Sequence, residues 1–137
     1  MELTHRPRRL RRTGPVRSLI RETELCPQHL IYPIFVTKGE HVRDPINTMP
    51  GQFRLSIDEV VQECEILLKL GVGAVNLFGY SPEKDETGKF AWDTEGLIPR
   101  CVRALKAAHP EVCVQTDVAL DPYTATCSGT FSPQGAD

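Results

Sequence analysis

The sequence predicts an α/β fold in which parallel strands alternate with helices. Three mainly apolar runs are expected to be strands, and the first, 30–36, is continuous without alternation, as is typical of a strand buried on both faces. Two intervening segments carry hydrophobic residues at three- and four-residue spacing, as helices do when one face packs on a sheet. The connections are long enough to join parallel strands. The expected strands are 30–36, 74–78 and 112–120, and the expected helices are 57–70 and about 96–108.

The first strand, Leu30-Ile-Tyr-Pro-Ile-Phe-Val36, contains a proline. Proline has no N–H group to give to a sheet, so Pro33 should mark an edge position, a bulge or a local break. The stretch that follows, 37–54, is polar and includes two prolines, and we expect it to be a loop.

The first helix has recognisable ends. Ser56 and Glu59 have the spacing of a capping box, and Gly71 can adopt the left-handed conformation that closes a helix. The second helix can accept Pro99 in its first turn and should stop before Pro110. The apolar stripe of the first helix is Ile57, Val60, Val61, Cys64, Leu67 and Leu68.

Three parallel strands with two crossover helices fit either an open doubly wound sheet or part of a barrel, and periodicity does not choose between them. No glycine-rich dinucleotide or phosphate-loop motif follows any strand.

Charge is distributed unevenly. The net charge of −2 argues against a protein that binds nucleic acid with its whole surface. Residues 1–21 nevertheless hold seven arginines and one acid, and the remainder is acidic. The basic segment could be a solvated arm, an arm that contacts another subunit, or a site for nucleic acid. We expect no nucleic-acid binding, because no aromatic residues lie among the arginines.

The five cysteines are widely spaced and form no zinc or disulfide pattern, which indicates a reducing compartment. No apolar run is long enough for a membrane span. We therefore expect a cytoplasmic protein. The alternative is an organelle such as the chloroplast, because an arginine-rich, acid-poor start is typical of transit peptides.

Several blocks, in order and at plausible spacing, resemble the porphobilinogen synthase (delta-aminolevulinic acid dehydratase) family. The resemblance runs from about residue 6 to Tyr123. The blocks are Arg6-Pro-Arg-Arg-Leu-Arg-Arg12, Leu30–Val36, Pro45-Ile46, Met49-Pro-Gly51, Arg54, Ser56, Gly71–Gly79, Lys84-Asp85, Gly88, Ala91 and Thr116–Tyr123.

The resemblance implies the N-terminal part, about three βα units, of a (β/α)8 TIM barrel with an N-terminal arm. It implies that residues 1–27 form a basic oligomerisation arm, that 28–123 form an incomplete barrel, and that 124–137 are an atypical, disordered tail. Family members join two molecules of 5-aminolevulinate into porphobilinogen with loss of water, through lysine Schiff bases, in tetrapyrrole (heme) biosynthesis. They form homo-oligomers, usually octamers.

The catalytic lysines of the family should lie beyond residue 137. All five lysines of this chain are expected to be solvated surface groups. Lys89 is the one that keeps a catalytic alternative, because its loop follows the C-terminal end of a strand. Asp117 is the candidate catalytic residue, because we expect it in the third strand near the end where barrel enzymes place their sites. The alternative is a structural aspartate that binds loop amides.

Asp121 is the candidate metal ligand. Zinc-using family members have a D-V-C-L-C run here, whereas this chain has Ala119 and Asp121 at the two cysteine positions. Zinc is therefore not expected at this place, and the pattern resembles the aspartate-type, magnesium-responsive members. Asp121 precedes Pro122 and could equally be a turn residue.

After Tyr123 the family's Gly/His/Asp-rich segment is missing, and we expect a foreign or out-of-frame terminus. Three functions remain open: a porphobilinogen synthase that is truncated and inactive alone, a non-catalytic remnant, or a basic-armed α/β binding module.

Overall fold

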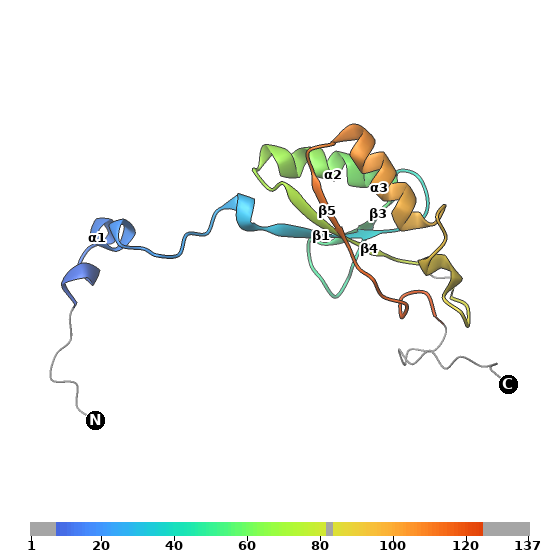
Figure 1. The fold of residues 1–137 in the computed structure, drawn as a ribbon, viewed down its shortest axis with the longest axis horizontal. Coiled ribbons are helices and arrows are strands. Elements are labelled where there is room, and N and C mark those ends of the chain that lie inside the picture. Colours follow the sequence, from blue (N-terminus) through green and yellow to red (C-terminus); the bar gives the residue numbers. More distant parts are fainter. Residues whose placement is uncertain (1–7, 82–83, 125–137) are drawn as a thin grey trace, which may run out of the picture.

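A five-stranded sheet forms the body of the molecule, and two helices lie against one of its faces (Figure 1). The structure is a computed structural model that describes residues 8–81 and 84–124. The strands are β1 (Ile31–Val36), β2 (Arg43–Pro45), β3 (Phe53–Leu55), β4 (Ala74–Gly79) and β5 (Cys113–Thr116), in the spatial order β2-β3-β1-β4-β5. The two helices are α2 (Ile57–Lys69) and α3 (Leu97–Ala108).

The topology decides between the two architectures that the sequence left open. Strands β1, β4 and β5 are parallel neighbours in chain order, and β3 is parallel to β1. Both crossover helices cover the same face of the sheet (Figure 1). A doubly wound sheet has helices on both of its faces, whereas the helices of a barrel all lie on the outer side of its sheet. The body is therefore a segment of a barrel.

The core lies between the sheet and the two helices. Ile34 and Val36 of β1 and Val75 and Leu77 of β4 alternate along their strands with more exposed residues. All the core residues are at most 6% exposed: Ile34, Val36, Leu55, Val60, Cys64, Leu67, Val75, Leu77, Cys101, Leu105 and Val112. On the opposite face of the sheet the rings of Phe35 and Phe78 stack, with centroids 5.6 Å apart. That face corresponds to the interior of a barrel.

The two predicted ends of α2 have different outcomes. Ser56 is the N-cap, but its side chain makes no capping bond, so the predicted capping box is wrong. The Ser56 hydroxyl instead accepts a hydrogen bond from the Val42 amide at 2.9 Å. The C-terminal prediction is confirmed: Gly71 has φ +84°, and the amides of Gly71 and Val72 donate to the carbonyls of Leu68 and Leu67.

Two predicted segments differ from the structure. The expected loop 37–54 contains the short strands β2 and β3, which pair antiparallel. The third strand ends at Thr116 instead of continuing to Leu120. The last residue pair between β4 and β5 is Leu77 with Thr116, and no pairing follows it.

Pro33 lies at an edge position, as predicted. The Tyr80 amide donates to the Val36 carbonyl, so even-numbered residues of β1 direct their backbone groups toward β4. Pro33 therefore faces the other side, where β3 pairs only with Phe35 and Val36. Its missing N–H group costs no hydrogen bond within this sheet.

The N-terminal segment extends away from the body (Figure 1). It contains the short helices η1 (Arg9–Arg11), α1 (Gly14–Leu19) and η2 (Pro27–His29). None of its described residues up to His29 is buried, and its exposed large apolar side chains are Leu10, Leu19, Ile20 and Leu25. No helix in the described part of the chain has the length and apolar character to cross a membrane.

Candidate active site

The carboxyl ends of β1, β4 and β5 lie at one edge of the parallel sheet, and the segments 80–94 and 117–124 begin there. Barrel enzymes build their active sites at this edge, from the loops that follow the strands. Both candidate residues from the sequence, Asp117 and Asp121, lie in the segment that follows β5.

Asp117 is the first residue beyond β5, not a residue within the strand. The predicted burial of its carboxylate among apolar neighbours is also wrong, because Asp117 is exposed and Val118 beside it is 98% exposed. The Asp117 amide donates to the Leu77 carbonyl at 3.4 Å, which continues the pairing with β4 by one bond. The backbone of Asp117 is thus anchored at the strand end while its side chain stays accessible.

The segment then turns back onto the sheet at Tyr123. The Tyr123 amide donates to the Leu120 carbonyl at 2.9 Å, and the Tyr123 carbonyl accepts from the Asp85 amide at 3.2 Å. Burial and, after it, the negative charge of Asp117 raise the pKa of the Tyr123 phenol. These contacts of Tyr123 were not predicted from the sequence, where the signal for them was an aromatic residue directly after Asp121 and Pro122.

Asp85 organises the loop on which that turn rests. Its Oδ1 accepts hydrogen bonds from the Thr87 amide at 2.8 Å, the Thr87 hydroxyl at 3.0 Å and the Lys89 amide at 3.2 Å. Its pKa is lowered: burial acts to raise it, but hydrogen bonds from Lys89, Thr87 and Gly88 outweigh burial. Asp85 also forms an isolated bridge with Thr124.

Asp121 lies in a turn and is exposed, which matches the structural alternative considered for it. Its backbone carbonyl accepts a hydrogen bond from Lys84 Nζ at 3.3 Å. All five lysines of the chain are exposed, as predicted. The Lys38 ammonium lies 5.3 Å from the centroid of the Phe90 ring, and Lys106 donates to the carbonyls of Pro110 and Val112.

A cavity of about 800 Å³ opens between α3, η3 (Lys89–Ala91) and the segment after β5. Its lining is mainly apolar and includes Trp92, Val102 and Leu120, with Asp117 and Arg103 as the charged groups. The Arg103 guanidinium already binds the Thr94 carbonyl at 3.0 Å and Glu95 at 2.8 Å.

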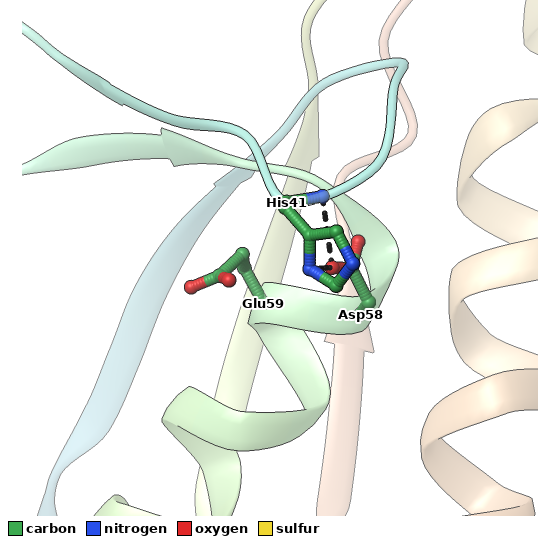
Figure 2. A group of neighbouring side chains, drawn as sticks. All are labelled: His41, Asp58 and Glu59. Carbon is green, nitrogen blue, oxygen red and sulfur yellow. Dashed lines mark hydrogen bonds and ion pairs between the residues drawn. The ribbon is translucent and has the colours of Figure 1, made fainter.

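A separate polar cluster lies at the N-terminus of α2 (Figure 2). Both the backbone amide and Nδ1 of His41 lie 2.9 Å from Oδ2 of Asp58. Hydrogen bonds from the Ser56 hydroxyl and the His41 amide lower the pKa of Asp58. Ligand atoms of His41, Asp58 and Glu59 lie within 4.8 Å of one another, so they are close enough to share a cation. However, the Arg43 guanidinium lies 3.8 Å from Glu59, and the positive end of the helix dipole also disfavours a cation here.

The parallel strands and the single helical face define the chain as part of a (β/α) barrel. The family model described as delta-aminolevulinic acid dehydratase matches residues 4–133. The chain belongs to the delta-aminolevulinic acid dehydratase family. The match extends beyond Tyr123, where the sequence motifs of the resemblance stop, and residues 125–133 lie outside the described residues.

Individual relatives agree with this assignment. The delta-aminolevulinic acid dehydratase of Synechococcus elongatus is 40% identical over 121 residues, covering 88% of this chain and 37% of the relative. The chloroplastic delta-aminolevulinic acid dehydratase 1 of Arabidopsis thaliana is 40% identical over 128 residues, covering 91% of this chain and 30% of the relative. The Toxoplasma gondii enzyme, solved in complex with its reaction product porphobilinogen, superposes with a TM-score of 0.82 at 39% identity, covering 90% of this chain and 35% of that one.

Proposed function

We propose that this chain forms the first part of a porphobilinogen synthase, a lyase that condenses two molecules of 5-aminolevulinate into porphobilinogen with loss of water. The observation that carries the proposal is the match of nine-tenths of the chain, at 39% identity, to an enzyme solved with porphobilinogen bound. The chain spans 30–37% of the length of the three relatives described above. The activity therefore belongs to a longer protein, and the chain alone is expected to be inactive.

The lysine chemistry of the family cannot come from the lysines described above. A lysine that forms a Schiff base must be neutral near pH 7, which requires a desolvated or electropositive pocket. The five lysines of this chain are exposed. The Schiff-base lysines would therefore lie on strands that this chain does not include.

Asp117 is the proposed catalytic residue of this portion. It is the first accessible side chain beyond β5, at the sheet edge where barrel enzymes bind substrate. Within 8–81 and 84–124 no hydrogen bond holds its carboxylate, which leaves that group able to interact with the substrate amino group or with a catalytic lysine from a later strand. The alternative, a structural aspartate, has less support, because only the backbone of Asp117 makes a hydrogen bond to β4.

Asp121 is the proposed metal ligand, and Mg²⁺ is the proposed ion for the longer enzyme. Magnesium prefers about six oxygen ligands in a near-octahedral arrangement. Around Asp121 the described residues do not provide such a set, and the Lys84 ammonium already binds its carbonyl. The described residues of this chain therefore supply at most one ligand of such a site, Asp121, and the other oxygen ligands would come from the rest of the longer enzyme.

The basic N-terminal arm, residues 1–27, is proposed to contact another subunit of a homo-oligomer, with an octamer as the family's usual state. The described part of the arm leaves four large apolar side chains exposed beside its arginines, and the remainder of the chain is acidic. Both features favour a protein partner over nucleic acid. The proposed location is cytoplasmic, with the chloroplast as the alternative because one relative is chloroplastic.

A chimera tests the function. Residues 1–123 of this chain, joined to the remainder of the Synechococcus elongatus relative, should form porphobilinogen from 5-aminolevulinate, whereas this chain alone should not. In the chimera, Asp117→Asn should lower kcat at least tenfold, while Asp121→Asn should chiefly change the response to Mg²⁺. A folded, oligomeric chimera without turnover would contradict the proposal.

A further inference from the structure

The outer side of β5 is an open edge of the sheet (Figure 1). β5 is the last strand in the spatial order, and the amides of Cys113 and Asp117 donate toward β4. Neighbouring residues of a strand direct their backbone groups to opposite sides, so Val114 and Thr116 direct theirs away from β4. Within residues 8–81 and 84–124 no strand pairs with that side. Val114 and Thr116 therefore each offer one donor and one acceptor.

This edge lacks the charges and the proline by which natural sheets prevent pairing with another sheet. An edge strand is usually protected by charged side chains, by proline or by its shortness. The opposite outer strand is protected in these ways: β2 is three residues long, two of them charged, and it ends at Pro45. β5, with the sequence Cys-Val-Gln-Thr, has no charge and no proline. Of the two outermost strands, only β5 is suited to accept a further strand.

An apolar surface lies beside the same edge, on the helical face of the sheet. Val118 is 98% exposed, and it lines the cavity of about 800 Å³ together with Trp92 and Leu120, which are also exposed. Val102 of α3 and Val114 of β5 line the same cavity. A partner that pairs with β5 would bring its own side chains over this cavity, and the burial of apolar surface favours such an association.

We propose that the outer side of β5 is a self-association surface, on which a second copy of this chain pairs its own β5 in the antiparallel direction. In the register that places Gln115 opposite Gln115 of the second copy, Val114 of each copy lies opposite Thr116 of the other. These residues have the outward backbone groups, so each of the two pairs exchanges two hydrogen bonds. Asp117 lies opposite Cys113, so no like charges meet. The edge is therefore complementary to itself.

The symmetry of this pairing also brings the apolar surfaces together. The two copies are related by a two-fold axis perpendicular to the sheet, so both carry their helices on the same face. The cavities beside the two β5 strands then adjoin, with Val118 of each copy facing the seam. Pairing uses both β5 edges and leaves β2 at each end of the combined sheet. Because β2 is protected, association stops at a dimer.

This surface is separate from the proposed function and from the arm. In the longer enzyme the next strand of the barrel would take the same hydrogen bonds of β5, so the dimer and the complete barrel exclude each other. The N-terminal arm extends away from the body of the protein (Figure 1). An oligomer that is held by the arm alone would leave the outer side of β5 unpaired.

Disulfide crosslinking tests both the pairing and its register. Residues that lie opposite each other in a non-hydrogen-bonded pair have Cα atoms about 4.5 Å apart, which is within the range of a disulfide. The background keeps the two buried cysteines and replaces the other three: Cys26→Ser, Cys113→Ser and Cys127→Ser. In that background Gln115→Cys should form a disulfide-linked dimer under mild oxidation. Gln62→Cys, at an exposed position of α2, is the matched control and should not crosslink.

Sedimentation velocity of this chain measures the strength of the dimer. Thr116→Pro removes the outward amide but leaves the ladder to β4 intact. It should weaken the dimer roughly tenfold or more, because two hydrogen bonds are lost per dimer. Thr116→Val keeps the amide and the size of the side chain, and it should sediment like the unchanged chain. Far-UV circular dichroism shows whether Thr116→Pro stays folded, and if it unfolds, the crosslinking decides.

Rapid crosslinking of Gln115→Cys together with a weakened dimer in Thr116→Pro supports the proposal. It is overturned if the unchanged chain sediments as a monomer, or if Gln115→Cys crosslinks no faster than Gln62→Cys. A folded Thr116→Pro variant that dimerises as tightly as Thr116→Val overturns it as well. Turnover by the chimera bears only on the proposed function, so the two proposals fail separately.

Discussion

Gly79→Ala is expected to destabilise the protein through one identifiable contact. The new methyl group would meet the Tyr123 hydroxyl oxygen at 2.0 Å, well inside van der Waals contact, and Ile98 Cγ1 at 3.1 Å. The phenol must therefore move away from β4. Overpacking of this kind costs about 1–3 kcal/mol in the free energy of unfolding.

Removing the hydroxyl should relieve most of that cost. In the double variant Gly79→Ala/Tyr123→Phe, the nearest remaining atoms are at 3.1 and 3.2 Å, which requires shifts of only a few tenths of an ångström. A double-mutant cycle should therefore give a favourable coupling of roughly 1–2 kcal/mol.

Urea unfolding followed by circular dichroism measures both quantities, provided that the m-value is unchanged. Gly73→Ala is the matched control, because nothing lies within 4 Å of its added Cβ and no positive φ is required there. The reasoning is refuted if Gly79→Ala and Gly73→Ala cost the same, or if Tyr123→Phe leaves the cost of Gly79→Ala unrelieved.

Three further changes test the core and the helix end. Leu105→Ala should lower the free energy of unfolding by about 2–5 kcal/mol because Leu105 is fully buried, whereas Leu70→Ala, at a side chain 64% exposed, should cost far less; urea titration compares them. Gly71→Ala should cost about 1–2 kcal/mol, because φ +84° strains any residue with a Cβ, and a cost below 0.5 kcal/mol would contradict this. Burial raises the pKa of the Cys101 thiol from 9.0 to about 12, so the folded state favours the neutral thiol. This preference stabilises the fold fully below about pH 9 and is lost as the pH rises toward 12. In Cys101→Ala the free energy of unfolding should therefore fall less steeply at alkaline pH. At pH 8 a thiol reagent should modify exposed Cys113 well before Cys101, and equal rates would contradict the burial.

The helices and the main strands were predictable because each carries a long, regular pattern. The stripe of α2 and the glycine that ends it were readable from spacing alone, and the structure confirms both. The capping box was not, because the hydroxyl of Ser56 has a competing partner, Val42, fourteen residues away in sequence. A sequence motif of four residues does not show that a residue far away in the sequence will take the same hydrogen bond.

The short strands and the strand ends were not predictable for a different reason. β2 and β3 have three residues each, too few to show a period, and Arg43-Asp-Pro45 has no strand-like composition. The apolar run 118–120 continues the pattern of β5, yet Val118 is exposed, because none of the described residues covers it. Hydrophobicity predicted burial correctly only where the chain itself supplies the covering element.

The candidate site shows the same limit. The sequence singled out Asp117 and Asp121 as candidates, which stay predictions, but it placed Asp117 within a strand that in fact ends at Thr116. The exposure of Asp117, and the loop around Asp85 that meets Tyr123, depend on contacts between segments more than thirty residues apart. Only the fold brings those segments together.

Within the described residues, β5 and the first half of β1 each have backbone groups that no neighbouring strand pairs. On β5, Cys113 and Asp117 donate toward β4, so Val114 and Thr116 offer both a donor and an acceptor outward. On β1, Ile31 and Pro33 face outward, and Pro33 offers a carbonyl without an amide. A strand that pairs with the free side of β5 can form every backbone hydrogen bond of a parallel ladder. A strand that closes a barrel by pairing with β1 would lack the hydrogen bond that an amide at Pro33 would donate.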